Sequence, residues 1–117
     1  MRAAAVHELG ITRNVVAIVA EAARGRRIRR VTLEVGKLSG VMSEAIAFCF
    51  DAVVLGTPVE GAVLDIREIE GRARCTACGV EFPTTTLFTP CACGCRTLVR
   101  LQGEELKIKS MELAEAA

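Results

Sequence analysis

The sequence predicts an α+β fold in which two helices pack on a small mixed three-stranded sheet, with a cysteine-rich lobe inserted before the last strand. Two early segments repeat apolar residues at helical spacing, and three other segments alternate apolar and polar residues as strands do. Five of the six cysteines lie between Cys75 and Cys95, ahead of the last alternating segment. We therefore expect a core of residues 1–70 and 104–117, and a separate lobe of residues 71–103.

The first helix is predicted over residues 8–24. Arg13, Asn14 and Glu21 lie on its polar side, and Gly25 follows it as a natural stop. The arginines around Gly25 are expected to form a solvated helix end, because positive and negative charges are balanced over the chain. The apolar face is expected to consist of Ile11, Val15, Ile18, Val19 and Ala22.

Strand-like and helical periods then alternate. Residues 31–35 and 63–67 are predicted strands, each with one buried face, and a helix between them makes a right-handed βαβ unit. That helix is predicted to have Ser43 as its cap. Cys49 lies on its apolar face and is interpreted as core filling. A third strand is predicted to begin near Leu106, after the cysteines.

Composition and charge exclude several classes of protein. The net charge is +1, from 15 basic and 14 acidic residues, so no global field draws the protein onto nucleic acid or an anionic membrane. Aromatic residues make up only 3%, with no Trp or Tyr, which argues against a base-stacking surface. No secretion signal or membrane-spanning segment is recognisable, so we expect a cytoplasmic protein. In that reducing compartment, clustered cysteines indicate metal ligands rather than disulfides.

The cysteines form two close-set groups, Cys75-Thr-Ala-Cys78 and Cys91-Ala-Cys93-Gly-Cys95. Two such turns facing each other are typical of a zinc ribbon, because four thiolates close a tetrahedron around Zn²⁺. Cys75, Cys78 and Cys91 are predicted ligands. The fourth ligand is either Cys93 or Cys95, and Cys93 is favoured because a glycine follows it, as one follows Cys78. We expect the bound zinc to be structural.

His7, the only histidine, and Glu8 stand at the start of the first predicted helix. The sequence around them, together with six further blocks, resembles the HypA/HybF family of hydrogenase maturation nickel chaperones, whose members begin with Met-His-Glu-Leu. The resemblance covers almost all of the chain from Val6 onward. It departs from the family in the five residues before Val6, at Ser43, where proline is common, and in the close spacing of the second cysteine group. The matching blocks are VHELGIT (6–12), VGKLSGV (35–41), SEA (43–45), FCF (48–50), EGAVLDI (60–66), CTACGVEF (75–82) and GEELKIK (103–109).

The resemblance implies a nickel metallochaperone and not an enzyme. In such a protein, His7 and Glu8 bind Ni(II) near the N-terminus, where imidazole and backbone nitrogens suit the square-planar preference of this ion. The nickel is then delivered, with a GTPase of the HypB type as partner, to the large subunit of a nickel-iron hydrogenase. Similar proteins in some organisms also serve urease maturation. Neither nucleic acid nor a membrane is expected as a partner.

Two alternatives are a zinc-ribbon adaptor and a nucleic-acid-binding module without nickel transfer. The lobe carries four arginines but only two aromatic residues, Phe82 and Phe88, which are few for stacking on nucleotides. An enzyme would need a nucleophile with its base, or an open metal position, and His7 is far in sequence from the cysteines. The metallochaperone is therefore favoured.

We also expect the working protein to begin at position 6. Members of the family have methionine directly before His-Glu-Leu, and Val6 is the residue that a GUG start codon gives when it is read as an internal codon. A chain that starts there has its free amine beside His7, and an amine is a better nickel donor than an amide.

Overall fold

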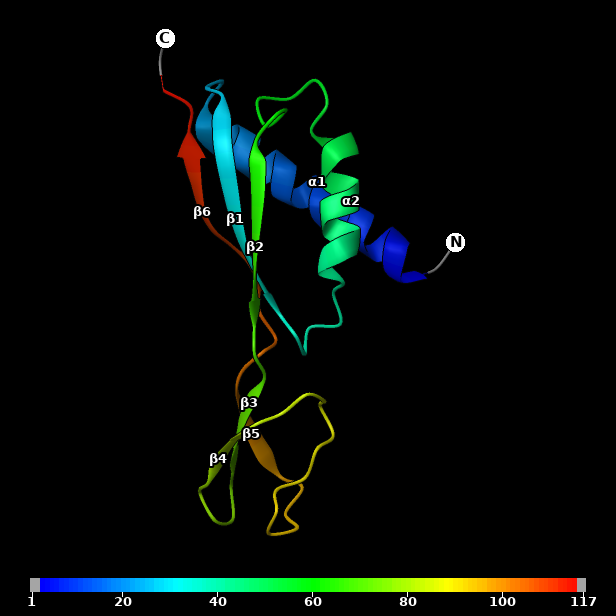
Figure 1. Cartoon of the computed structure of the whole chain (residues 1–117), viewed down its shortest axis with the longest axis vertical. Helices are drawn as coiled ribbons and strands as arrows, with labels where there is room; N and C mark the ends of the chain where they lie inside the picture. The colour runs from blue at the N-terminus through cyan, green and yellow to red at the C-terminus, as the bar shows by residue number, and fades with distance from the viewer. Residues whose placement is uncertain (1–2, 116–117) are drawn as a thin grey trace. The chain divides into compact units, whose positions relative to one another are not determined.

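The computed structural model describes residues 3–115, with side chains from His7 onward, so the predicted start at Val6 lies outside the described side chains. This part of the chain contains two helices and six strands (Figure 1). No helix within residues 3–115 combines the length and apolar character needed to span a bilayer. The elements are α1 (Ala3–Ala23), β1 (Ile28–Gly36), α2 (Ser43–Val53), β2 (Val63–Ile69), β3 (Arg72–Cys75), β4 (Glu81–Pro83), β5 (Leu98–Gln102) and β6 (Leu106–Leu113).

One sheet joins strands from both ends of the chain in the order β2-β1-β6. Strands β1 and β2 run in the same direction in Figure 1 and β6 runs against them, so the sheet is mixed and the predicted α+β class is confirmed. As the middle strand, β1 buries consecutive residues, Val31, Thr32 and Leu33. Consecutive side chains of a strand point to opposite faces of the sheet, so the expectation of a single buried face on this strand is wrong.

Helix α1 begins at Ala3 rather than Glu8, and its buried side only partly matches the predicted one, because Val15 and Val19 are buried as expected but Ala22 is exposed. Ile18 is 56% exposed and Ile11 is only half-buried. Apolar residues occur on several sides of this helix, so periodicity alone did not identify the side that packs. The contact between α1 and α2 helps to determine which side of α1 is buried. The buried residues of α1 are Glu8, Thr12, Val15, Val16, Val19 and Ala23.

Helix α2 begins at Ser43, but the predicted serine cap is wrong. Met42, with an extended backbone, is the N-cap residue, and its side chain makes no cap hydrogen bond. The Ser43 hydroxyl is buried without a hydrogen-bond partner among the described residues. The hydrogen-bond acceptor at this end of α2 comes from α1 instead. Glu8 Oε2 accepts a hydrogen bond from the Met42 backbone N–H at 2.6 Å. A carboxylate from a distant part of the sequence thus serves this end of the helix.

The chain divides into two compact units. The second unit holds a sheet in the order β4-β3-β5, in which β3 pairs antiparallel with both neighbours. The domain limits expected above, residues 1–70 with 104–117 and residues 71–103, stay a prediction. The first unit comprises residues 1–33, 42–67 and 107–117, and the second unit comprises residues 34–41 and 68–106.

Three glycines let backbone segments approach closely within the second unit. A Cβ atom on Gly36 would lie 2.0 Å from the carbonyl oxygen of Gly103, and one on Gly71 would lie 2.3 Å from that of Thr84. A Cβ atom on Gly103 would lie 2.9 Å from Cδ1 of the buried Leu38. These separations are below van der Waals contact, so a side chain at any of the three positions would displace the opposing chain.

Alanine at position 36 is expected to lower the free energy of unfolding by about 2–3 kcal/mol, because the added methyl group forces two backbones apart. Gly10→Ala is the matched control, since a Cβ atom there meets nothing within 4 Å. That variant should gain about 0.5–1 kcal/mol from helix propensity. Urea denaturation followed by circular dichroism measures both variants. A Gly36→Ala protein as stable as the wild type would contradict the close approach of Gly36 and Gly103.

Candidate metal centre

The first cysteine turn follows directly from strand β3. Cys75 ends β3, and its backbone N–H donates to the carbonyl oxygen of Val80 at 2.9 Å. Gly79 closes the turn by donating its N–H to the Cys75 carbonyl oxygen at 3.0 Å. The φ angle of Gly79 is 76°, a left-handed value that favours glycine. The N–H groups of Ala77 and Cys78 donate to Cys75 Sγ at 3.3 and 3.5 Å, which holds this sulfur inside the turn.

The second cysteine turn has a similar construction with a shorter spacing. The Gly94 N–H donates to the Cys91 carbonyl oxygen at 2.8 Å, and the Cys91 N–H donates to the Cys95 carbonyl oxygen at 3.0 Å. Gly94 has a φ angle of 93°, again in the left-handed region. The glycine after Cys93 therefore turns the chain as the glycine after Cys78 does.

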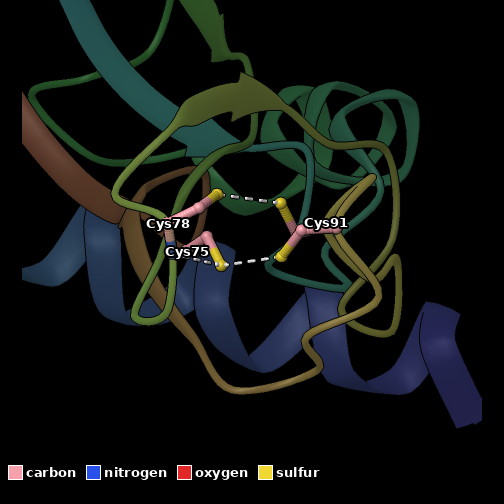
Figure 2. Close-up of side chains that lie close together, drawn as sticks. Cys75, Cys78 and Cys91 are labelled. Atoms are coloured by element: carbon pink, nitrogen blue, oxygen red, sulfur yellow. Dashed lines mark hydrogen bonds between the residues drawn. The ribbon is translucent and has the colours of Figure 1, made fainter.

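The two turns bring four sulfur atoms together (Figure 2). Cys75 Sγ is 3.6 Å from Cys93 Sγ, and Cys78 Sγ is 3.6 Å from Cys91 Sγ. All four atoms lie within 4.8 Å of one another. Sulfurs around a tetrahedral zinc ion with bonds of about 2.3 Å are about 3.8 Å apart, so this four-sulfur cluster has the dimensions that Zn²⁺ requires. Four soft ligands with no open position suit a structural metal.

Without a cation, the thiols of Cys75, Cys91 and Cys93 do not ionise together. A hydrogen bond from the Cys78 backbone is the largest effect on Cys75, whose pKa is lowered to about 6. A hydrogen bond from the Cys93 backbone lowers the pKa of Cys91, but burial and the neighbouring thiols outweigh it and raise that pKa to about 12. The pKa of Cys93 is also raised, since the Cys75 thiol and burial outweigh the Cys95 backbone. A divalent cation favours the charged form of every thiol and removes this conflict.

The remaining two cysteines lie outside the four-sulfur cluster. Cys95 Sγ is 3.6 Å from the carbonyl oxygen of Thr97 and 3.8 Å from Thr76 Oγ1. Cys49 is half-buried in α2 and belongs to the first unit. The structure therefore gathers Cys93, and not Cys95, with the three other cysteines.

The two residues predicted to bind nickel are neighbours in α1 with different surroundings. The His7 side chain is exposed, whereas Glu8 is 0% exposed. One oxygen of the Glu8 carboxylate accepts the Met42 N–H, and the other, Oε1, has no partner among the residues described. The imidazole is thus open to a metal ion and the carboxylate is covered. Both residues belong to the first unit, and the four-sulfur cluster belongs to the second.

The contact between Glu8 and Met42 was not predicted from the sequence, although part of the signal was present. Glu8 lies one helical turn before Thr12, on the side of α1 that continues through Val15 and Val19. A buried carboxylate needs a hydrogen-bond donor, and the N-terminus of another helix offers backbone N–H groups. The sequence does not reveal which helix end lies within reach.

Known proteins are similar in sequence to this chain over most of its length. The family model described as "Hydrogenase/urease nickel incorporation, metallochaperone, hypA" matches residues 6–113. The hydrogenase maturation factor HypA of Nostoc sp. is 53% identical over 110 residues, which cover 94% of this chain and 97% of the relative. The factor of the same name from Geobacter metallireducens is 49% identical over 109 residues, which cover 92% of this chain and 99% of the relative.

Two solved structures share the fold. The solution structure of the Ni metallochaperone HypA from Helicobacter pylori has a TM-score of 0.65 at 22% identity, covering 91% of this chain and 96% of that one. A second solution structure of a HypA protein has a TM-score of 0.67 at 24% identity, covering 93% and 97%. At these identities the structures support the fold alone. From the family match and the relatives of about half-identical sequence, this chain belongs to the HypA family of nickel metallochaperones, which act in hydrogenase maturation.

Proposed function

We propose that this protein binds Ni(II) near its N-terminus and delivers it to the large subunit of a nickel-iron hydrogenase, with a GTPase of the HypB type as partner. Zinc bound by Cys75, Cys78, Cys91 and Cys93 stabilises the second unit. The observation that carries the proposal is the separation of donors, with an exposed His7 in one unit and four sulfurs in the other. Family membership supports the nickel and the hydrogenase. We place these steps in the cytoplasm, where thiols stay reduced.

The donor chemistry supports a different metal in each unit. Four thiolates in a closed tetrahedron suit Zn²⁺ and leave no position for exchange. Ni(II) favours nitrogen ligands in a square plane, which an imidazole and backbone nitrogens supply. A carrier must also release its ion to a partner, and a partner can reach an ion bound to the exposed side chain of His7.

For Glu8, the backbone nitrogen is the part that we assign to nickel. The carboxylate is buried and accepts the Met42 N–H, so it is already engaged within the first unit. Ni(II) at a site of this kind takes nitrogen in preference to a carboxylate oxygen. His7 therefore contributes its imidazole, and Glu8 contributes main-chain nitrogen.

Serine in place of Cys93 is expected to abolish stoichiometric zinc binding, whereas serine in place of Cys95 should leave it intact. The reason is geometric, because Cys93 Sγ lies in the four-sulfur cluster and Cys95 Sγ lies beside Thr97. The zinc content of each purified protein, measured by mass spectrometry of the metal after dialysis, gives the answer. The reverse result would show that the longer turn from Cys91 to Cys95 closes the site.

Zinc affinity is expected to fall as pH falls, by about a hundredfold or more per pH unit between pH 8 and pH 6. The pKa values of Cys91 and Cys93 are raised, so both thiols are protonated throughout this range and each must lose a proton to bind the metal. Competition with a chelator of known affinity at several pH values measures the slope. Zinc affinity that is constant over this range would contradict the raised pKa values.

Replacing His7 by alanine should abolish tight nickel binding and leave the zinc content and the circular dichroism spectrum unchanged. The side chain is exposed and lies in the unit without the four-sulfur cluster, so its loss should not disturb the fold. Glu8→Gln is the control, since glutamine keeps an acceptor for the Met42 N–H and an unchanged backbone nitrogen. Calorimetric titration with Ni(II) compares the three proteins. Wild-type nickel affinity in His7→Ala would disprove the N-terminal site.

The same proteins test delivery. Nickel-loaded wild-type protein, with the GTPase and GTP, should raise the nickel content of a hydrogenase large-subunit precursor, and His7→Ala should not. If His7→Ala supported nickel insertion as well as the wild type, the zinc-ribbon adaptor would be the better description. If the wild type bound nickel but transferred none, the protein would be a nickel-binding module and not a carrier.

A further inference from the structure

A cavity of about 280 Å³ lies in the second unit, lined by residues of β3, of β5 and of the two segments that precede and follow the second cysteine turn. Its volume is close to the lower end of the range for ligand pockets, about 300–1,000 Å³. The buried Ala73 and the half-buried Leu98 form part of an apolar lining. No cysteine contributes to the lining, so the cavity is distinct from the four-sulfur cluster.

Hydrogen bonds within residues 84–89 hold the rim of the cavity. Thr84 Oγ1 donates to the carbonyl oxygen of Thr86 at 2.7 Å, and the Thr86 and Thr89 hydroxyls are 2.8 Å apart. The Phe88 backbone N–H donates to Thr86 Oγ1 at 3.1 Å. The threonine hydroxyls thus shape the rim, and they leave Leu87 and Phe88 exposed, Phe88 at 83%. A preformed rim with an exposed aromatic ring lowers the entropic cost of binding.

The charged groups of the cavity are all positive. Arg96 and Arg100 contribute to its lining and no acidic residue does. Arg100 Nε is 3.4 Å from Glu104 Oε1, an exposed ion pair that contributes little. The Arg96 side chain makes no hydrogen bond or ion pair within the part of the chain that the structure describes. The guanidinium groups are therefore available for an anionic group that enters the cavity.

We propose that this cavity is a docking site for a partner protein, and that it takes a segment in which a carboxylate side chain is next to an apolar one. The carboxylate pairs with Arg96 and Arg100, and the apolar side chain packs on Leu98 and the exposed ring of Phe88. The inference goes beyond the proposed function and does not depend on nickel, because every residue that lines the cavity lies within the second unit.

A protein segment explains the surface better than other anions do. A small carboxylate inside the cavity would leave the Phe88 ring in water, whereas a polypeptide lies across the rim and covers it. A nucleic acid would need several rings for stacking, and Phe88 is the one aromatic residue in the lining. Aromatic and arginine side chains are also the residues that contribute most at protein interfaces.

Fluorescence anisotropy with labelled octapeptides tests the proposal. The probe is an acetylated peptide of alternating glutamate and leucine, and the comparison peptide has glutamine in place of each glutamate. The zinc-loaded, full-length wild type should bind the acidic peptide at least about tenfold more tightly than the neutral one. Arg96→Gln and Phe88→Ser should each weaken binding of the acidic peptide by about tenfold, because each removes one of the two proposed contacts.

Arg74→Gln is the matched control, since Arg74 lies on β3 of the same unit, carries the same charge and does not line the cavity. It should bind the acidic peptide as the wild type does, and equal zinc contents confirm that all the variants are folded. Equal weakening by Arg74→Gln and Arg96→Gln would overturn the proposal in favour of nonspecific charge attraction. Failure of the acidic peptide to bind would also overturn it, as would equally tight binding of free 4-methylpentanoate.

Discussion

Four sulfur atoms within 4.8 Å of one another are the constraint on which the second unit depends. The low pKa of Cys75 and the high pKa of Cys91 show that these thiols compete for ionisation when no cation compensates their charge. The strands of this unit have only four, three and five residues, which is too little for a substantial hydrophobic core. Two of its buried residues, Cys75 and Cys91, are themselves part of the cluster. Zinc therefore stabilises the second unit, as buried apolar side chains stabilise the first unit.

The predictable features were those determined by neighbours in sequence. The α+β class and the mixed sheet follow from changes of hydrophobic period, which reflect the geometry of each element. The two metal turns are similarly local, because Gly79 and Gly94 adopt left-handed backbone conformations that other residues avoid. The glycine that follows Cys93, like the one that follows Cys78, also favoured Cys93 as the fourth ligand, and the structure places its sulfur with the other three. Local chemistry was sufficient for these features.

The features that could not be predicted depend on contacts between distant segments. Ile18 is exposed because the side of α1 that is buried depends on what packs against it. Ser43 is not the cap of α2, because a residue 34 positions away from Met42 supplies the carboxylate. The cavity is lined by residues of β3, β5 and residues 84–89 together with Arg96, and no single segment among them has a sequence pattern that predicts it. Sequence patterns describe single elements well and say little about where their surfaces meet.

The buried carboxylate of Glu8 affects the energetics of any ion bound through the first turns of α1. Consecutive side chains on an α-helix point about 100° apart, so this turn presents His7 to solvent while Glu8 contacts the backbone at the start of α2. An ion that takes up the backbone nitrogens of His7 and Glu8 displaces hydrogen bonds of this helical turn, and any accompanying shift of Glu8 alters its side-chain contact with Met42. Linkage then requires reciprocity, because two equilibria that share a contact share one coupling free energy. Whatever loosens the start of α2 strengthens binding of the ion, and the ion loosens the start of α2 by the same factor.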